Sequence, residues 1–269
     1  MQNSKRMAGL WLMAVFVLGP AAAFENGSDD WVLSGTTKLS PDRRLGPADS
    51  REFAHIRETA NDNTPSYAVD INATLITAAA QNDLQGVEML LKNGADANAN
   101  DVLGNRPLLH ASRLGSAEMV RILLEAGADP NAKGMGYTAL GLAALNGYAQ
   151  VADWLLQFGA YVEKRSDNDL TPLMNAALLN NVTTIQVLLR YDAVVDRENN
   201  AGRTALSYAA EGGAEQVIGL LLARGADINA VDKKFNTPLF WASLRDQRSA
   251  VRLLLRRGAD QGAVSLDLL

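Results

Sequence analysis

The chain has 269 residues, of which 48% are hydrophobic, and its 25 Lys and Arg against 30 Asp and Glu give a formal net charge of −5. This acidic balance argues against nucleic acid as a partner, because phosphate binding requires Lys and Arg clustered along one face. The sequence contains no cysteine, which excludes a disulfide, a lipid-modified cysteine and a cysteine nucleophile.

Residues 1–23 have the pattern of a secretory signal peptide. Lys5 and Arg6 precede an apolar run from Met7 to Leu18, and small residues follow up to Ala23. That run is about a dozen residues, whereas a helix that spans a membrane needs about 20. We therefore expect export to a bacterial periplasm, cleavage after Ala23 and no stable membrane insertion. An uncleaved membrane anchor is the alternative.

Residues 24–66 are rich in Asp, Ser, Gly, Arg and Pro, a composition typical of a flexible linker. Within this segment, residues 49–59 predict a short helix with Phe53 and Ile56 on one face. We expect that face to cover the first structural unit that follows.

From residue 67 to residue 264 the sequence repeats with a period near 33 residues. Each unit opens on Thr-Pro-Leu, Thr-Ala-Leu or a variant of these, and closes on Gly-Ala-Asp or a variant. The best-kept copy predicts a helix that ends at Gly213 and a second helix over 214–224 that ends before Gly225. Residues that tolerate a left-handed conformation stand at the turn between the helices in every copy: Asn82, Gly115, Gly147, Asn180, Gly213 and Asp246.

This period, with Thr-Pro-Leu at the front and Gly-Ala-Asp at the back, resembles the ankyrin repeat. The resemblance implies an all-α repeat fold, an ankyrin solenoid of about six helix-turn-helix repeats with short β-hairpin fingers. The repeats are expected at 67–100, 101–132, 133–165, 166–198, 199–231 and 232–264, with a C-terminal tail at 265–269. A single unit cannot bury both of its helices, so equivalent leucines of neighbouring units should form one core: Leu90, Leu123, Leu155, Leu188, Leu221 and Leu254.

The polar residues do not indicate an enzyme. Of the two histidines, His55 lies outside the repeats and His110 lies in a predicted core helix, where a packed, hydrogen-bonded ring is expected. No pair of residues has the spacing of a metal site, and no phosphate-binding glycine loop is present. The acidic residue that recurs in the repeats favours turn hydrogen bonding over a calcium site. We expect no catalytic residue, no cofactor and no metal.

The ankyrin resemblance implies that a partner protein lies in the concave groove formed by the finger tips and the first helices. The fold would then serve as a monomeric adaptor, inhibitor or stabiliser of that partner. Tyr137 and Leu170 are the expected finger-tip contacts, whereas Leu145, Leu178 and Leu244 could instead pack against the next repeat. The complete set of expected contact residues is Leu103, Asn105, Arg113, Met135, Tyr137, Leu145, Asn168, Leu170, Leu178, Arg203, Glu211, Lys234, Asn236 and Leu244.

Three further expectations concern single repeats. Arg245, Arg248, Arg252 and Arg256 are expected on the last helix, with Arg257 beside them, either as a polar cap or as a site for anionic headgroups or a small anionic ligand. Phe240 and Trp241 are expected in the core of the last repeat. The fourth repeat carries Asp192 where other copies have glycine, so we expect it to be the weak point of the stack.

Overall fold

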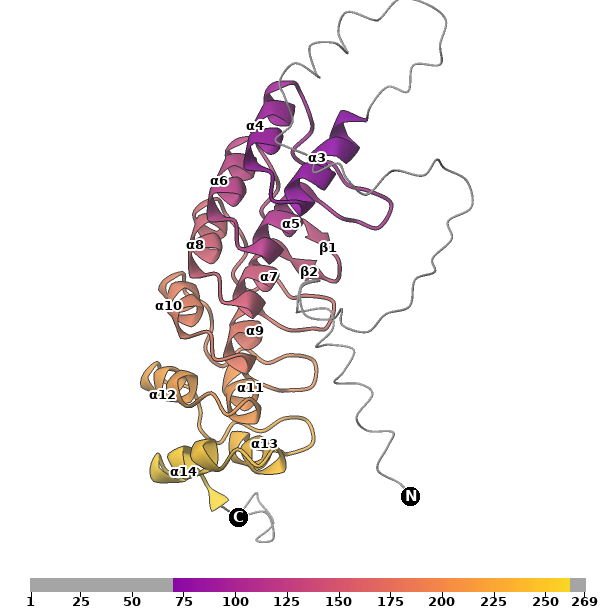
Figure 1. The fold of residues 1–269 in the computed structure, drawn as a ribbon. Helices are drawn as coiled ribbons and strands as arrows, with labels where there is room; N and C mark the ends of the chain where they lie inside the picture. The colour runs from indigo at the N-terminus through magenta and orange to yellow at the C-terminus, as the bar shows by residue number, and fades with distance from the viewer. Residues whose placement is uncertain (1–69, 262–269) are drawn as a thin grey trace, which may run out of the picture. The chain divides into compact units, whose positions relative to one another are not determined.

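The structure, a computed structural model, describes residues 70–261 (Figure 1). The expected signal peptide at 1–23, linker at 24–66, helix at 49–59 and tail at 265–269 lie outside these residues. Over residues 70–261, the helices are all too short or too polar to cross a bilayer.

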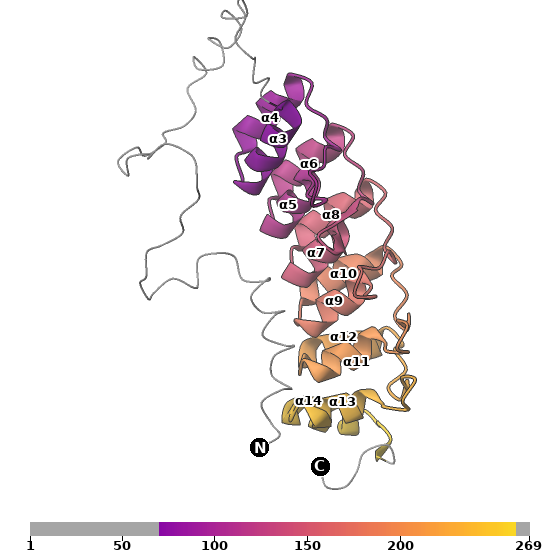
Figure 2. The same ribbon diagram turned by 90° about the vertical axis from the view of Figure 1, so that its right-hand side faces the viewer.

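The described residues form twelve helices that alternate between an inner and an outer row (Figures 1 and 2). Each inner helix packs against the outer helix of its own repeat and against the inner helices of the neighbouring repeats. The inner helices are α3 (Ile71–Ala80), α5 (Pro107–Leu114), α7 (Ala139–Asn146), α9 (Pro172–Leu178), α11 (Ala205–Glu211) and α13 (Pro238–Leu244). The outer helices are α4 (Leu84–Lys92), α6 (Ala117–Glu125), α8 (Ala149–Gln157), α10 (Val182–Arg190), α12 (Glu215–Ala223) and α14 (Arg248–Arg256).

The Thr-Pro-Leu signature begins an inner helix. Thr171 is the N-cap of α9, and its hydroxyl accepts the backbone N–H of Met174 at 3.3 Å. Pro172 then occupies the first helical position, where its fixed φ is already helical and no N–H is needed. Leu173, the third residue of the signature, is buried in the core. One tripeptide therefore supplies the cap, the first turn and a core side chain.

The expected core and turns are confirmed. The six equivalent leucines of the outer helices are all buried, and each such side chain contributes about 1.5–3 kcal/mol of burial free energy. All six expected turn residues between inner and outer helices have positive φ, from 53° at Asp246 to 77° at Gly147. Asp192, at the end of α10, is also left-handed, with φ of 60°.

Asparagine side chains connect consecutive repeats beneath the outer helices. The Asn98 side chain accepts the backbone N–H of Asp129 at 2.7 Å and donates to the carbonyl of Gly127 at 2.8 Å. The carboxylate of Asp96 accepts the backbone N–H of Asn98 at 2.8 Å, which confirms turn hydrogen bonding for this recurring acidic position. In two middle copies the asparagine is replaced by Glu163 and Asp196, which still accept a backbone N–H from the next repeat.

The fingers that precede the inner helices close in two ways. Strands β1 (Lys133–Gly134) and β2 (Tyr137–Thr138) form an antiparallel hairpin with Lys133 opposite Thr138. Its two tip residues, Met135 and Gly136, both have positive φ, as a type I′ turn requires. In the last finger, the Asp232 carboxylate instead accepts backbone N–H groups of Lys234 and Asn236, at 2.8 and 2.9 Å. Asp101 and Asn199 brace their fingers in the same way, so these fingers close without a β ladder.

Candidate partner-binding face

The expected contact residues occupy three columns that run from repeat to repeat. The first column lies at the finger tips. Leu103, Asn168 and Lys234 are exposed there, and Met135 is half-buried. These residues are accessible to a partner, as expected.

The second column consists of the residue that follows the left-handed tip residue of each finger. These residues do not lie at the finger tips. Leu170 is only 8% exposed and belongs to the core, so its expected exposure at a finger tip is wrong. Tyr137 lies on β2 and is half-buried against the same core, so it too is not at a tip. The side-chain amides of Asn105 and Asn236 donate hydrogen bonds to the carboxylates of Asp101 and Asp232. The tip residue before each of them has positive φ and reverses the chain, so the next residue already lies on the returning segment.

The third column lies at the C-terminal ends of the inner helices. Leu244 is exposed, whereas Leu145 and Leu178 are half-buried. Two exposed leucines of this column were missed by the sequence analysis, Leu114 at the end of α5 and Leu179 just after α9. The signal that could have identified them is a leucine directly before the left-handed turn residue, where other copies have Asn146, Gly212 or Arg245.

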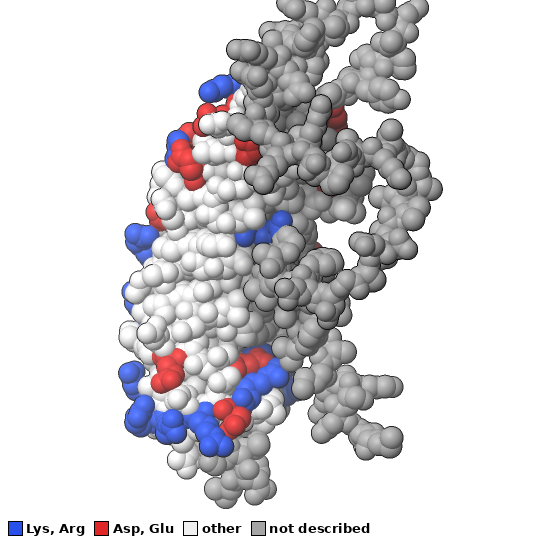
Figure 3. Space-filling view, viewed as in Figure 1, with Lys and Arg blue, Asp and Glu red and all other residues white. Residues whose placement is uncertain are grey.

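These five side chains, Leu114, Leu145, Leu178, Leu179 and Leu244, are called the leucine strip below. Its middle members, Leu145, Leu178 and Leu179, lie in stretches without charge, since residues 139–152 and 170–189 contain no charged side chain. Figure 3 shows the same trend on the face it presents, where charged residues gather toward the two ends of the described array. A partner that meets this region therefore meets mainly apolar and uncharged polar groups.

An ion cluster joins the last two repeats beside the strip. Glu211 pairs with Arg203 at 2.5 Å and with Arg245 at 2.6 Å. The Arg203 and Glu211 side chains are only 12% and 13% exposed, so both expected contact residues are already held by internal partners. Arg245 belongs to the end of α13 and not to the last helix, which corrects the grouping expected from the sequence.

Aromatic rings enclose the cation of this cluster. The Arg203 guanidinium carbon lies 4.0 Å from the centroid of the Tyr208 ring and 3.9 Å from that of Trp241. Trp241 and Phe240 are half-buried and stack edge to face at 5.6 Å, so they pack at the surface of the last repeat and not within its core. Burial raises the pKa of Glu211, but hydrogen bonds from Arg203 and Arg245 outweigh burial and hold it below the usual range.

The last finger displays an exposed aromatic ring. Phe235 is 80% exposed and has φ of 63°, at the position that is glycine in three other fingers. A bulky residue in this conformation is strained, and such strain is concentrated at functional sites. The backbone N–H of Lys233 donates to the carbonyl of Ala201 at 2.9 Å, which braces this finger against the previous one. The tip therefore holds Phe235 outward beside two exposed lysines, Lys233 and Lys234.

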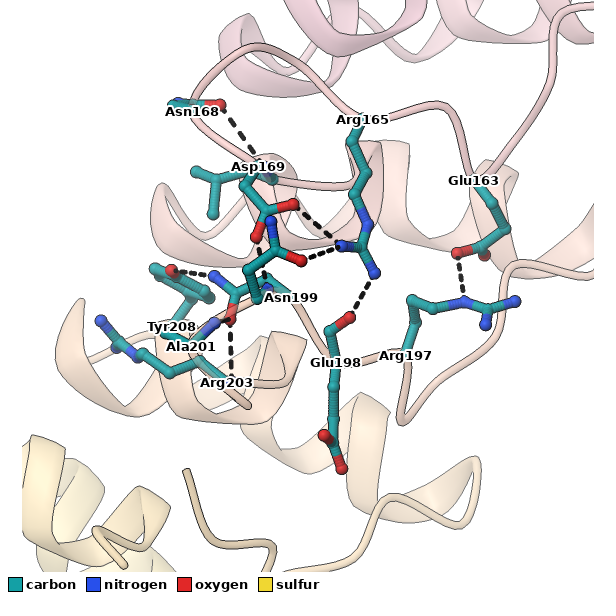
Figure 4. A network of polar contacts seen from close by, with 12 residues as sticks. Glu163, Arg165, Asn168, Asp169, Arg197, Glu198, Asn199, Ala201, Arg203 and Tyr208 are labelled. Carbon is teal, nitrogen blue, oxygen red and sulfur yellow. Dashed lines mark hydrogen bonds and ion pairs between the residues drawn. The ribbon is translucent and has the colours of Figure 1, made fainter. Parts of the chain in front are cut away.

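The charged residues of the middle fingers are paired with one another (Figure 4). Arg165 forms an ion pair with Asp169 at 2.8 Å and also donates to the carbonyl of Glu198. Asp169 accepts the backbone N–H of Asn200, and Arg197 pairs with Glu163 at 3.1 Å. Burial raises the pKa of Asp169, but the bonds from Asn200 and Arg165 outweigh burial and lower it. This network connects the third, fourth and fifth repeats to one another.

The remaining expected contact residue and the histidine lie together on α5. Arg113 is half-buried. His110 is buried as expected, and burial, followed by the charge of Arg113, lowers its pKa, but its Nδ1 has no hydrogen-bond partner. Across residues 70–261, no three side chains of His, Asp or Glu converge as metal ligands would.

Family models locate the repeats in the sequence. The model described as ankyrin repeats (3 copies) matches residues 75–166 and 158–232, and the ankyrin repeat model matches residues 234–265. The chain belongs to the ankyrin-repeat family. Ankyrin repeats generally mediate protein–protein interaction and are typically non-catalytic, and they present an extended concave surface for binding.

A solved structure supports the same fold. This ankyrin-repeat chain is similar to the crystal structure of an ankyrin repeat domain from Acinetobacter baumannii, with a TM-score of 0.62 and 33% identity. The match covers 69% of this chain and 98% of that one.

Curated relatives share the repeats over part of their length. The chain is 35% identical over 120 residues to the putative ankyrin repeat protein FPV031 of Fowlpox virus, which covers 43% of this chain and 35% of that protein. It is 32% identical over 167 residues to zygote-specific protein 3 of Chlamydomonas reinhardtii, which covers 60% of this chain and 40% of that protein. The chain thus spans less than half the length of these relatives.

Proposed function

We propose that this ankyrin-repeat protein is a non-enzymatic module that binds one partner protein in the periplasm, as its adaptor, inhibitor or stabiliser. The observation that carries the proposal is the leucine strip. Its three exposed members, Leu114, Leu179 and Leu244, lie at or next to the C-terminal ends of inner helices in three different repeats. With the half-buried Leu145 and Leu178, they place apolar side chains at this end of the inner helices in four of the six repeats.

Folding does not require leucine at the positions of Leu114 and Leu179, directly before the left-handed turn residue. In the other four copies the residue before the turn is Gln81, Asn146, Gly212 or Arg245, and their inner helices form equally well. Exposed apolar area concentrated on one face marks an interface more often than it marks a packing need. Leu103 and Phe235, exposed at the first and last described finger tips, add apolar anchors in the same repeats as Leu114 and Leu244.

The location rests on the sequence. The basic, apolar and small-residue regions of residues 1–23 support export, and a chain without cysteine has no thiol to mispair in an oxidising compartment. Protein recovered from the periplasm should begin at Phe24, which N-terminal sequencing would establish.

Capture of the partner tests the function. The full chain with its own leader would carry a C-terminal tag, and proteins crosslinked to it in the cell would be identified by mass spectrometry. A variant with Leu103→Glu and Leu179→Glu should fold, because both side chains are exposed, yet lose the partner. The matched control is Val194→Glu with Val231→Glu, two exposed apolar residues in the loops after outer helices.

A protein captured by the wild type and the valine variant but lost from the leucine variant supports the proposal. The same proteins with all three chains, or a partner lost equally from both variants, would contradict it. Circular dichroism and a urea unfolding curve for each variant distinguish lost binding from lost folding.

A further inference from the structure

The last helix, α14, carries a stripe of arginines on its solvent side. Arg248, Arg252 and Arg256 follow one another at intervals of four residues, which places them along one side of a helix. All three are exposed, and Arg257 adds a fourth exposed cation at the C-cap. In Figure 3 this end of the described array is dominated by Lys and Arg.

Little of this positive charge is neutralised within the array. Arg248 pairs with Asp246, but both side chains are 79% exposed, so the pair contributes little. Arg252 donates to the hydroxyl of Ser249 at 3.3 Å. Among residues 70–261, no carboxylate lies within ion-pair distance of Arg252, Arg256 or Arg257. These cations are therefore available to an external anion.

The need for a polar surface at the end of the array does not explain why the charged residues of α14 are all positive. Outer helices elsewhere in the array combine both charges, as in α6, where Arg121 pairs with Glu118 and Glu125. Such mixed faces are wettable without self-repulsion, whereas arginines four residues apart on one helix repel one another. The stripe on α14 thus costs stability that solubility alone does not require.

The charge is polarised along the array. Residues 199–261 contain nine Lys and Arg against six Asp and Glu, whereas residues 70–132 contain four against eight. An extended anionic surface would attract the α14 end and repel the opposite end. The array would then contact that surface through its last repeat.

Apolar side chains border the arginine stripe. Val251 and Leu255, both half-buried, lie beside Arg248 and Arg252 on the helix. A helix with a basic face and flanking aliphatic side chains is typical of elements that lie on a lipid headgroup layer. The arginines lie along the side of a single helix, an arrangement that suits a flat lipid surface.

We propose that the exposed face of α14 binds the headgroups of anionic phospholipids and orients the array on a membrane surface. This inference is independent of the leucine strip, because it involves different residues at the end of the array. A chain could hold its partner without binding lipid, or bind lipid without holding a partner.

Sedimentation with vesicles tests the inference. The full chain would be incubated with phosphatidylcholine vesicles, with and without about 30% phosphatidylglycerol. Each arginine near an anionic surface contributes about fivefold to partitioning, so replacing Arg248, Arg252 and Arg256 by Gln should lower it on the order of 100-fold. Binding of the wild type should also weaken as salt rises, because the Debye length shortens.

The matched control is Arg121→Gln, Arg190→Gln and Arg197→Gln, which removes the same charge from other repeats. Partitioning of this control within about threefold of the wild type, together with loss in the α14 variant, supports the inference. Equal loss in both variants would show a general charge effect and overturn it. Equal binding to vesicles without phosphatidylglycerol, or binding of soluble glycerol phosphate but not of vesicles, would also overturn it.

Discussion

The guanidinium carbon of Arg203, in the fifth repeat, lies 3.9 Å from the centroid of the Trp241 ring in the sixth. The Tyr208 ring lies at a similar distance, so the planar cation contacts two rings while it pairs with Glu211. Stacking of this kind depends on a planar, weakly hydrated cation. The contact therefore stabilises the interface between the last two repeats.

Replacing Arg203 by Lys should lower the free energy of unfolding by about 1–2 kcal/mol, because Lys keeps the charge but cannot stack as a plane. Urea unfolding at neutral pH measures the change. Arg197→Lys, at a more exposed ion pair, serves as the control and should change stability by less than about 0.5 kcal/mol. Equal stability of Arg203→Lys and the wild type would show that the rings contribute nothing.

The lowered pKa of Glu211 makes its contribution dependent on pH. A depressed folded-state pKa means that stabilisation is complete above the ordinary value of about 4.3 and is lost as pH falls through the lower folded value. Glu211→Gln should therefore be less stable than the wild type by about 2 kcal/mol at neutral pH. Urea curves at decreasing pH should show this gap closing below about pH 4. A gap that stays constant or widens in acid would contradict the assignment.

Asp196→Asn should stabilise the protein. Asp196 stands where Asn98 both accepts and donates between repeats, but an ionised carboxylate only accepts. Burial, and then the charge of Asp227, raises the pKa of Asp196, so its ionised form is penalised and the penalty fades as pH falls. Since the residue is exposed, solvent screens most of that penalty, and the restored hydrogen bond should account for a gain of about 0.5–1 kcal/mol.

Thermal unfolding at neutral pH and at about pH 4 would measure the gain, which should be smaller in acid. The contrast is Glu163→Gln, which should destabilise because Glu163 has an ion pair with Arg197. A variant Asp196→Asn that unfolds earlier than the wild type would refute the hydrogen-bond argument.

Phe235→Asn should raise stability while weakening partner binding. Asn tolerates the left-handed conformation that strains Phe, so relief of up to about 1 kcal/mol is expected at φ of 63°. Removing the exposed ring also removes an apolar anchor for the partner. Unfolding curves and partner capture measure the two effects, and a loss of stability would show that the ring is needed by the fold itself.

Asp192→Gly should strengthen the fourth repeat by about 1 kcal/mol, because glycine adopts a φ of 60° without steric cost. Native-state hydrogen exchange of α9 and α10 would report the local change. In the wild type we expect these helices to exchange faster than those of the third repeat. If α9 and α10 exchanged more slowly than every other helix of the array, the fourth repeat would not be the weak point.

Several features of this protein could be predicted from the sequence because they depend on local chemistry that the repeats present six times. Position within the period predicts that Leu123 and Leu188 lie in the core and that Asn180 and Gly213 lie in left-handed turns, as the structure shows. The α14 arginines were also found in this way, since spacing along one helix fixes their side. Repetition turns a weak local signal into a strong one.

Other features were decided only by the tertiary structure. The reversal at the finger tip places Leu170 in the core, whereas Leu179, just after α9, is exposed. Arg203 meets Trp241, and Glu211 meets Arg245, across an interface between repeats. Such contacts depend on how two repeats are rotated and how far each side chain reaches, and residues more than thirty positions apart carry no local trace of either.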